Sequence, residues 1–306
     1  MQSRTISDQF VSEVLRIVGS EQVWFEEPLQ FHTTFQIGGP AEVFVKPRSF
    51  EEVSALVALA HAGGVPMRVL GNGSDLLVSD QGVRGMVLCI LDNLSRIAIS
   101  DTTLEAQAGA TNKQVASAAL EARLEGFEFA EGIPGTIGGA AIMNAGAYGG
   151  EFCDVCVALT CVDEAGRIVT VKREDAEWGY RHSMMDDAGL VVLAATLQLA
   201  YGDPCAIQAR MDDLAARRRE KQPLDMPSAG STFKRPEGYF AGKLIQDSGL
   251  QGYSVGGAQV STKHAGFVVN TGGATASDVW GLIQDVQREV NRQFGVFLEP
   301  EVRYWE

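Results

Sequence analysis

Two glycine-rich segments interrupt a regular alternation of helix-like and strand-like patterns. They are "LGNGSDLLV" (70–78) and "EGIPGTIGGAAIMNAGAYGGE" (131–151). The first lies between two short apolar runs typical of strands, and the second is too long to be a simple turn. Glycine permits positive φ and close backbone approach, so successive N–H groups in such loops can converge on a phosphate oxygen. The pattern predicts a mixed α/β protein in which two loops either hold a diphosphate or serve only as tight, closely packed turns.

Neither glycine-rich segment, nor a third stretch at 238–244, fits a familiar nucleotide-binding motif. The stretch "GNGSDL" lacks the third glycine of a dinucleotide-binding turn and leads into a strand, which excludes a Rossmann turn. The stretch "GYFAGKL" (238–244) is one residue short of a P-loop and has Leu244 where Ser or Thr would bind magnesium. ATP hydrolysis is therefore not expected.

Apolar periodicity places the remaining elements. Helices are predicted at 10–18, 49–64, 111–126, 205–219 and 277–295, and strands at 41–47, 67–70, 76–79 and 190–200, with a hairpin at 157–171 that turns at 164–166. Capping boxes are predicted at Ser49–Glu52 and at Thr111–Gln114, and Gly126 is predicted to end the helix that begins at Thr111.

Charge and cysteine content limit the partners. The 306-residue chain has a formal net charge of −14, which disfavours nucleic acid and anionic membranes as partners. Residues 1–24 place acidic residues among the apolar ones, so we expect no secretory leader and a cytoplasmic protein with reduced thiols. The pair in "CDVC" (153–156) lacks a second pair or a histidine cluster, so we expect strand-borne core cysteines and no metal site.

Three polar residues lie beside apolar or glycine-rich sequence. They are Arg181 in "WGYRHS", Ser231 in "AGSTFKRP" and Glu301 in "LEPEVRYW". Each alone has an ordinary structural explanation, but together they match one chemical need. Hydride addition to an electron-poor alkene leaves an enolate, which requires a cation, a hydrogen-bond donor and a proton source at carbon.

Seven blocks of the sequence resemble, in order, those of the UDP-N-acetylenolpyruvoylglucosamine reductase family. They are "FHTTFQIGGPAEVFV", "GNGSDLLV", "GIPGTIGGAAIMNAGAYGGE", "WGYRHS", "SAGSTFKRP", "AGKLIQDSGLQGYSVGGAQVSTKHAGFVVN" and "LEPEVRYWE", and they run from about residue 30 to the end. The short distance between "GYRHS" and "AGSTF" resembles the type II branch, which lacks an inserted βαββ unit and a tyrosine loop.

The resemblance implies an α+β fold: an FAD-binding module of the vanillyl-alcohol-oxidase (PCMH) type and a C-terminal α/β substrate-binding domain. We expect FAD-binding subdomain 1 at 1–74, completed by 296–306, FAD-binding subdomain 2 at 75–204, and the substrate domain at 205–295. The implied reaction is that of a monomeric oxidoreductase of peptidoglycan synthesis. NADPH reduces non-covalent FAD, and flavin N5 then passes hydride to UDP-N-acetylglucosamine enolpyruvate, giving UDP-N-acetylmuramate.

The resemblance also implies roles for individual residues. Ser231 matches the proton donor to the enol carbon, and Arg181 and Glu301 match the pair that stabilises the enol. Substrate contacts fall on Lys221, Arg235 and His264. Cofactor contacts fall on Gly71, Asn72, Gly73, Ser74, Asp75, Gly132, Ile133, Pro134, Gly135, Thr136, Gly138, Gly139, Asn144, Ala145, Gly146 and Arg218.

Two positions depart from the family pattern. Gln36 replaces the usual Arg or Lys, and Asp75 replaces a common Asn and adds negative charge near the expected diphosphate. Two other functions remain open: an FAD-linked alcohol or lactone oxidase of the same fold, and a non-catalytic UDP-sugar-binding regulator. The only histidines of the first half, His32 and His61, lie outside the glycine loops, which disfavours an oxidase with covalently attached flavin.

Overall fold

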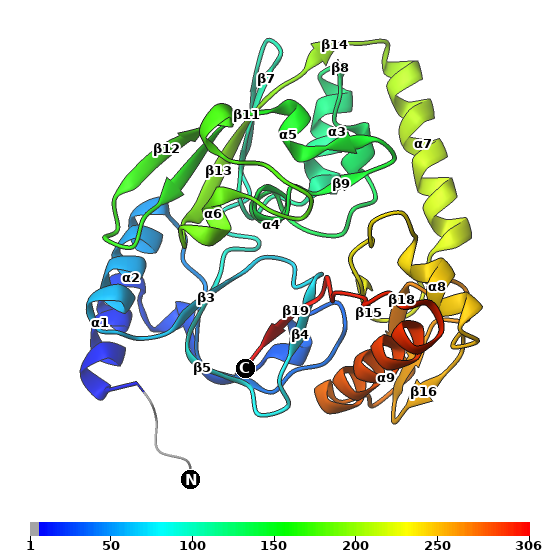
Figure 1. The fold of residues 1–306 in the computed structure, drawn as a ribbon. Coiled ribbons are helices and arrows are strands. Elements are labelled where there is room, and N and C mark those ends of the chain that lie inside the picture. The colour runs from blue at the N-terminus through cyan, green and yellow to red at the C-terminus, as the bar shows by residue number, and fades with distance from the viewer. Residues whose placement is uncertain (1–5) are drawn as a thin grey trace. The chain divides into compact units, whose positions relative to one another are not determined.

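The computed structural model describes residues 6–306, so residues 1–5 of the first predicted subdomain lie outside the described part (Figure 1). The chain divides into two compact units. Unit 1 contains the described residues up to Glu26, together with Glu42–Asn72 and Arg84–Ala216, and unit 2 contains Glu27–Ala41, Gly73–Val83 and Arg217–Glu306. The predicted boundaries at 74, 204 and 295 stay a prediction.

Unit 1 has two larger sheets and two short two-stranded ones, β10-β9 and β14-β8. The strand order is β1-β2-β5-β3 in the four-stranded sheet and β12-β11-β13-β7-β6 in the antiparallel five-stranded sheet. Helices α1 and α2 pack together, and α4 packs on β13 (Figure 1). The helices are α1 (Asp8–Val18), η1 (Ser20–Gln22), α2 (Phe50–Ala62), α3 (Asn112–Glu121), η3 (Glu128–Ala130), α4 (Ile137–Ile142), α5 (Phe152–Val155), η4 (Arg173–Asp175), α6 (Met184–Asp187) and α7 (Pro204–Lys221), the last ending in unit 2.

The strands that complete unit 1 are short. They are β1 (Val23–Pro28), β2 (Pro40–Val45), β3 (Met67–Leu70), β5 (Val83–Cys89), β6 (Ile97–Ser100), β7 (Thr103–Gln107), β8 (Leu124–Glu125), β9 (Gly146–Ala147), β10 (Gly150–Glu151), β11 (Cys156–Val162), β12 (Ile168–Lys172), β13 (Val191–Gln198) and β14 (Ala200–Tyr201). Strand β13 is buried over most of its length, as predicted for 190–200.

Unit 2 packs helices on a small antiparallel sheet of order β15-β18-β17-β16. Helix α9 lies against β16 and β17, and α8 packs on α9 (Figure 1). Strands β4 and β19 form a separate parallel pair, so the C-terminal segment is hydrogen-bonded to the strand that follows the first glycine loop. The elements are η2 (Leu29–Phe31), β4 (Leu76–Val78), β15 (Ser228–Ser231), α8 (Ala241–Asp247), β16 (Ser254–Val255), β17 (Ala258–Val260), β18 (Phe267–Asn270), α9 (Ala276–Phe294) and β19 (Arg303–Trp305).

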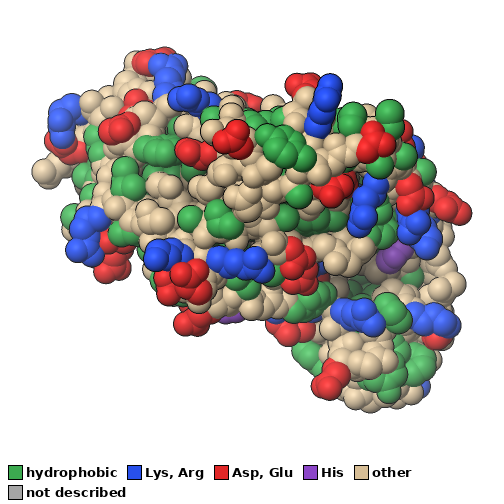
Figure 2. Space-filling model, turned by 90° about the horizontal axis from the view of Figure 1, so that it is seen from above, with side chains coloured by type: hydrophobic (Ala, Val, Ile, Leu, Met, Phe, Trp, Pro, Cys, Tyr) green, Lys and Arg blue, Asp and Glu red, His purple; other side chains and the backbone are tan. Residues whose placement is uncertain are grey.

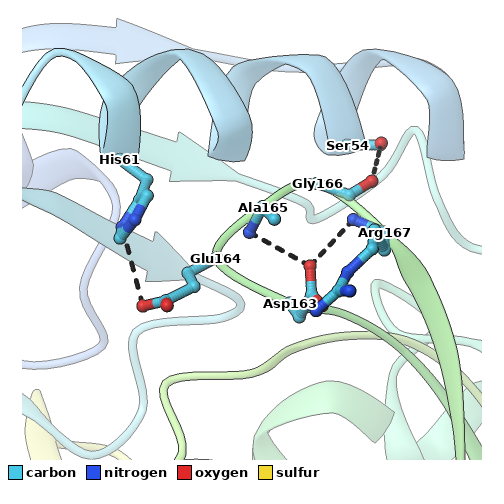
Figure 3. Close-up of polar contacts among 7 residues, drawn as sticks. All are labelled: Ser54, His61, Asp163, Glu164, Ala165, Gly166 and Arg167. Atoms are coloured by element: carbon cyan, nitrogen blue, oxygen red, sulfur yellow. Dashed lines mark hydrogen bonds and ion pairs between the residues drawn. The ribbon is translucent and has the colours of Figure 1, made fainter.

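The predicted hairpin between β11 and β12 is confirmed, and its turn packs on α2 (Figure 3). The Asp163 carboxylate accepts hydrogen bonds from the N–H groups of Ala165 (3.0 Å) and Arg167 (2.9 Å) and from the Arg167 Nε (2.7 Å). Ser54 on α2 donates to the Gly166 carbonyl. Figure 3 shows that the turn and the helix face each other over this contact.

Three local predictions need correction. Helix α3 ends at Glu121 and not at Gly126, because Arg123 takes a left-handed φ of 58° and the chain then pairs β8 with β14. Glu52 accepts from the Arg48 N–H rather than completing the capping box at Ser49. Cys153 lies in the short helix α5 and is only partly buried, whereas Cys156 and Cys161 are core residues as predicted.

Surface charge is mixed on the face shown in Figure 2, where acidic and basic side chains alternate with apolar ones. Over residues 6–306, no helix combines the length and apolarity needed to span a membrane. Within the same residues, no group of three or more His, Cys, Asp or Glu side chains is placed to hold a metal ion.

Candidate active site

The first glycine loop follows β3 and requires glycine at its centre. Gly73 has a φ of +59°, and a Cβ built there would lie 2.2 Å from the carbonyl oxygen of His32. The Gly73 carbonyl also accepts a hydrogen bond from the Thr34 N–H at 3.1 Å. The loop is therefore packed closely against the backbone of residues 32–34.

The second loop leads into α4, and unit 1 brings Gly71 against it. A Cβ on Gly71 would lie 2.5 Å from the Thr136 Oγ1, the atom that caps α4 by accepting from the Gly139 N–H at 3.4 Å. Gly138 is also closely packed, because its Cβ would lie 3.0 Å from that of Ala108. These glycines leave room for the side chains of Thr136 and Ala108, which a Cβ at either position would crowd.

The arrangement fits a cofactor held mainly by backbone groups. Gly139 in the first turn of α4 is exposed, and the only atom close to a Cβ built there is the Thr136 Oγ1 at 3.8 Å. Asn112, only 1% exposed, fixes the preceding loop: its N–H donates to the Gly135 carbonyl (3.1 Å) and its Nδ2 to the Ile133 carbonyl (3.3 Å). An open, glycine-lined backbone surface on a fixed loop is what a dinucleotide requires.

Arg181 lies at the tip of a tight turn in unit 1. Gly179 and His182 exchange two backbone hydrogen bonds (3.1 and 3.3 Å), and Arg181 between them has a left-handed φ of 55°. Its guanidinium lies 5.0 Å from the centre of the Tyr180 ring, within cation–π range. A non-glycine residue with positive φ costs about 1 kcal/mol or more, so the surrounding contacts must hold this turn in place.

Thr232 joins the segments that carry Ser231 and Glu301, both in unit 2. Ser231 is exposed at the end of β15 and pairs with Phe267 of β18. The next residue, Thr232, accepts a hydrogen bond from the Glu301 N–H at 2.8 Å through its carbonyl and one from the Val268 N–H at 3.0 Å through its buried Oγ1. The exposed Ser231 thus ends β15, and the residue after it is hydrogen-bonded to the backbone of Glu301.

Cationic residues lie near the end of α7. His264 is half-buried, and its Nδ1 accepts from the Gly266 N–H at 3.1 Å, which places the proton of the neutral ring on Nε2. Burial and, less strongly, the positive charge of Lys221 lower the pKa of His264 below its ordinary value. Lys263 donates to the Arg219 carbonyl at 2.6 Å and so joins this loop to the helix. Nearby in the sequence, Arg218 is 4% exposed.

Arg235, also in unit 2, is exposed and held by its own loop. Its guanidinium lies 4.1 Å from the centre of the Phe240 ring, and its Nε donates to the Tyr239 carbonyl at 3.3 Å. Both aromatic side chains are exposed. The contact holds one cation against an aromatic surface, where an anion or a planar ring can be bound.

The expected residues therefore form local groups within each unit. In unit 1, Gly71 lies against Thr136 and, as described below, Asn144 is hydrogen-bonded to the turn of Arg181. In unit 2, Thr232 joins the segments of Ser231 and Glu301, and the charge of Lys221 helps to lower the pKa of His264. Sequence reasoning missed Asn112 and Thr232, which position their loops through buried side chains. The Thr111–Gln114 capping box, confirmed at the start of α3, was the only nearby signal for Asn112.

The fold and these loops define an FAD-binding oxidoreductase. Residues 41–172 match the FAD binding domain family, and the solved structure of 4-ethylphenol oxidase from Gulosibacter chungangensis has a similar fold (TM-score 0.50, 16% identity, covering 64% of this chain and 44% of that one). At that identity the likeness concerns the fold alone. The expected α+β fold with an FAD module is confirmed.

Three further likenesses identify the family. Residues 222–305 match the C-terminal domain of UDP-N-acetylenolpyruvoylglucosamine reductase. The UDP-N-acetylenolpyruvoylglucosamine reductase of Agathobacter rectalis is 49% identical over 310 residues, covering 97% of this chain and 98% of that protein. The solved reductase of Thermus caldophilus has a TM-score of 0.79 at 33% identity, covering 93% and 98%. The chain belongs to the UDP-N-acetylenolpyruvoylglucosamine reductase family.

Proposed function

We propose that this protein reduces UDP-N-acetylglucosamine enolpyruvate to UDP-N-acetylmuramate with NADPH, a step of peptidoglycan precursor synthesis. The observation that carries the proposal is the exposed Ser231 hydroxyl at the end of a strand, beside the segment of Glu301. Family membership favours this reaction over alcohol oxidation and over a purely regulatory role.

FAD, when bound, accepts hydride from NADPH and supplies it to the enolpyruvyl group. The glycine loops at 71–75 and 132–146 would hold it, and we propose non-covalent binding because neither loop contains the histidine or cysteine needed for attachment. Their backbone N–H groups suit a diphosphate, and Arg218 adds a buried positive charge.

The protein's own side chains complete the chemistry. Arg181 and Glu301 stabilise the enol left by hydride addition, the arginine by its positive charge and the carboxyl by hydrogen bonding. Ser231 donates its proton to the enol carbon. A serine hydroxyl is a weak acid, so it can protonate only an intermediate that is basic enough to take the proton. The exposed, fixed position of Ser231 therefore matters, because the hydroxyl must meet that intermediate.

The substrate's anionic groups require local cations in a protein with a net charge of −14. We propose that Lys221 and Arg235 supply this charge. His264, with a lowered pKa and its proton on Nε2, would act as a neutral hydrogen-bond donor to the substrate. We also propose a cytoplasmic location, in which the five free cysteines stay reduced. The monomeric state and the type II branch stay predictions.

Ser231→Ala tests the proton-donor role by separating the two half-reactions. NADPH should bleach the flavin band of the variant at the parental rate, whereas return of the band on adding the enolpyruvyl substrate should slow by at least about 100-fold, as loss of a general acid does. Ser228→Ala, on the same strand, is the matched control and should behave like the parent. Equal losses in both half-reactions of Ser231→Ala would refute the role.

A further inference from the structure

Two buried side chains join the Arg181 turn to the second glycine segment. The Asn144 Nδ2 donates to the Gly179 carbonyl at 3.1 Å, and the Ser183 Oγ donates to the Ile142 carbonyl at 2.8 Å. Asn144 is 1% exposed and Ser183 is 0% exposed. The turn from 179 to 182 is therefore tied at both ends to residues 142–144, all within unit 1.

The hydrogen bonds of Asn144 fix the orientation of its amide and use both of its donors. Its Oδ1 accepts from the Cys153 N–H at 3.0 Å, so this atom must be the oxygen. Its Nδ2 donates to the Glu151 carboxylate at 3.0 Å as well as to Gly179, and an amide nitrogen has two hydrogens. The side chain has no donor left for a bound cofactor.

Backbone strain shows why such ties are needed. Asn144 has a φ of 41° and Arg181 a φ of 55°, both in the left-handed region. Asparagine tolerates this region far better than arginine does. A strained residue persists only where its surroundings over-determine its conformation, and here the tying bonds come from the cofactor segment.

We propose that Asn144, assisted by Ser183, is a positioning residue that sets Arg181 relative to the segment that binds FAD. The backbone at 144–146 contributes to the cofactor loop, while the Asn144 amide holds the arginine turn. This proposal rests on the enol-stabilising role proposed for Arg181. It implies that the cofactor loop and the enol-stabilising arginine are placed by one shared set of hydrogen bonds.

The test variant is Asn144→Asp in combination with Glu151→Gln. Aspartate keeps the preference for positive φ and still accepts from the Cys153 N–H, and glutamine at 151 donates to the new carboxylate. Of the three hydrogen bonds of the Asn144 side chain, only the one to Gly179 is therefore lost. Ser183→Ala independently removes the hydrogen bond to the Ile142 carbonyl. Asn112→Asp is the matched control, because it disturbs the cofactor loop at Ile133 and leaves the arginine turn intact.

The first measurement is hydrogen exchange of the cofactor-free protein over residues 179–183, whose amides include the paired N–H groups of Gly179 and His182. Exchange should rise at least about tenfold in the Asn144 double variant and in Ser183→Ala, and stay at the parental rate in Asn112→Asp. Unchanged exchange in both the Asn144 double variant and Ser183→Ala would overturn the proposal, and this outcome does not depend on any measurement of catalysis.

The second measurement is transient kinetics with FAD bound. In Ser183→Ala, a change outside both glycine loops, FAD affinity and flavin reduction by NADPH should stay within about threefold of the parent. Reoxidation by the enolpyruvyl substrate should slow about 10–100-fold in Ser183→Ala and in the Asn144 double variant, as a displacement of about 1 Å does. A parallel fall in FAD affinity and both half-reactions would overturn the positioning role. If Arg181→Met leaves reoxidation unchanged, the proposed role of Arg181 fails, whereas the exchange result still decides the tie.

Discussion

Replacing Gly73 by alanine should damage the first glycine loop much more than its conformation alone would suggest. The left-handed φ of +59° costs an L-residue about 1–2 kcal/mol. The added Cβ would also lie 2.2 Å from the His32 carbonyl oxygen and 2.9 Å from the Thr33 Cα, both backbone atoms that cannot rotate away. Overpacking of this kind costs about 1–3 kcal/mol more, so the variant should lose about 2–5 kcal/mol in total.

Gly64→Ala separates the two contributions. Gly64 has the same φ of +59°, but no atom lies within 4 Å of its Cβ position. The loss of unfolded-state entropy is the same for both substitutions, so the difference between the two variants isolates the steric contribution.

Thermal and urea unfolding of the two variants would measure that difference directly. Gly73→Ala should fall below Gly64→Ala by about 1–3 kcal/mol, or about 2–4 °C for each kcal/mol. FAD titration should show weaker binding only for Gly73→Ala, because its loop must move. Equal stabilities and equal FAD affinities would show that the backbone at His32 moves away from the added Cβ without cost, and would refute the reasoning.

Two pH effects follow from named contacts. The pKa of His264 in the folded protein lies below its ordinary value, so the unfolded state takes up the proton first as the pH falls. The stability contribution of the neutral ring is therefore lost below the pKa of the unfolded state. Lys221→Met should raise the pKa of His264 in an NMR titration, and an unchanged pKa would contradict the assigned cause. The backbone N–H of Arg167 lowers the pKa of Asp163, a contribution present above the unfolded value and lost as pH falls through the folded one. Asp163→Asn should therefore flatten the acid side of the Tm–pH curve, and an unaltered curve would show that the turn contributes nothing.

Local sequence patterns correctly predicted the elements whose capping or turn residues lie within a few residues of their ends. Helix α9 begins with a capping box at Thr275–Asp278 and ends at Gly295, whose φ is 67°. The prediction of 277–295 missed only the position of the N-cap. The hairpin at 157–171 was predicted equally well, because its turn chemistry lies within five residues of sequence.

Predictions failed where a distant partner overrides the local signal. Gly126 was a sound stop signal, yet α3 ends earlier because residues 124–125 pair with β14, whose sequence lies more than seventy residues away. Cys153 looked like a strand residue by alternation. Its N–H is instead held by Asn144, and this bond keeps the segment in a helical turn.

The same distinction separates the parts of the candidate site. The proposed reacting groups were named from short motifs and a family resemblance, and their roles stay a prediction. The residues that position them could not be named in this way, since Asn144 and Gly179 are separated by 35 residues, and Ser183 and Ile142 by 41. A positive φ at an arginine has no signature in the sequence at all, because local sterics disfavour it and only tertiary contacts impose it. The arginine turn is thus a place where local rules fail and where, under the proposal above, two functional segments are held together.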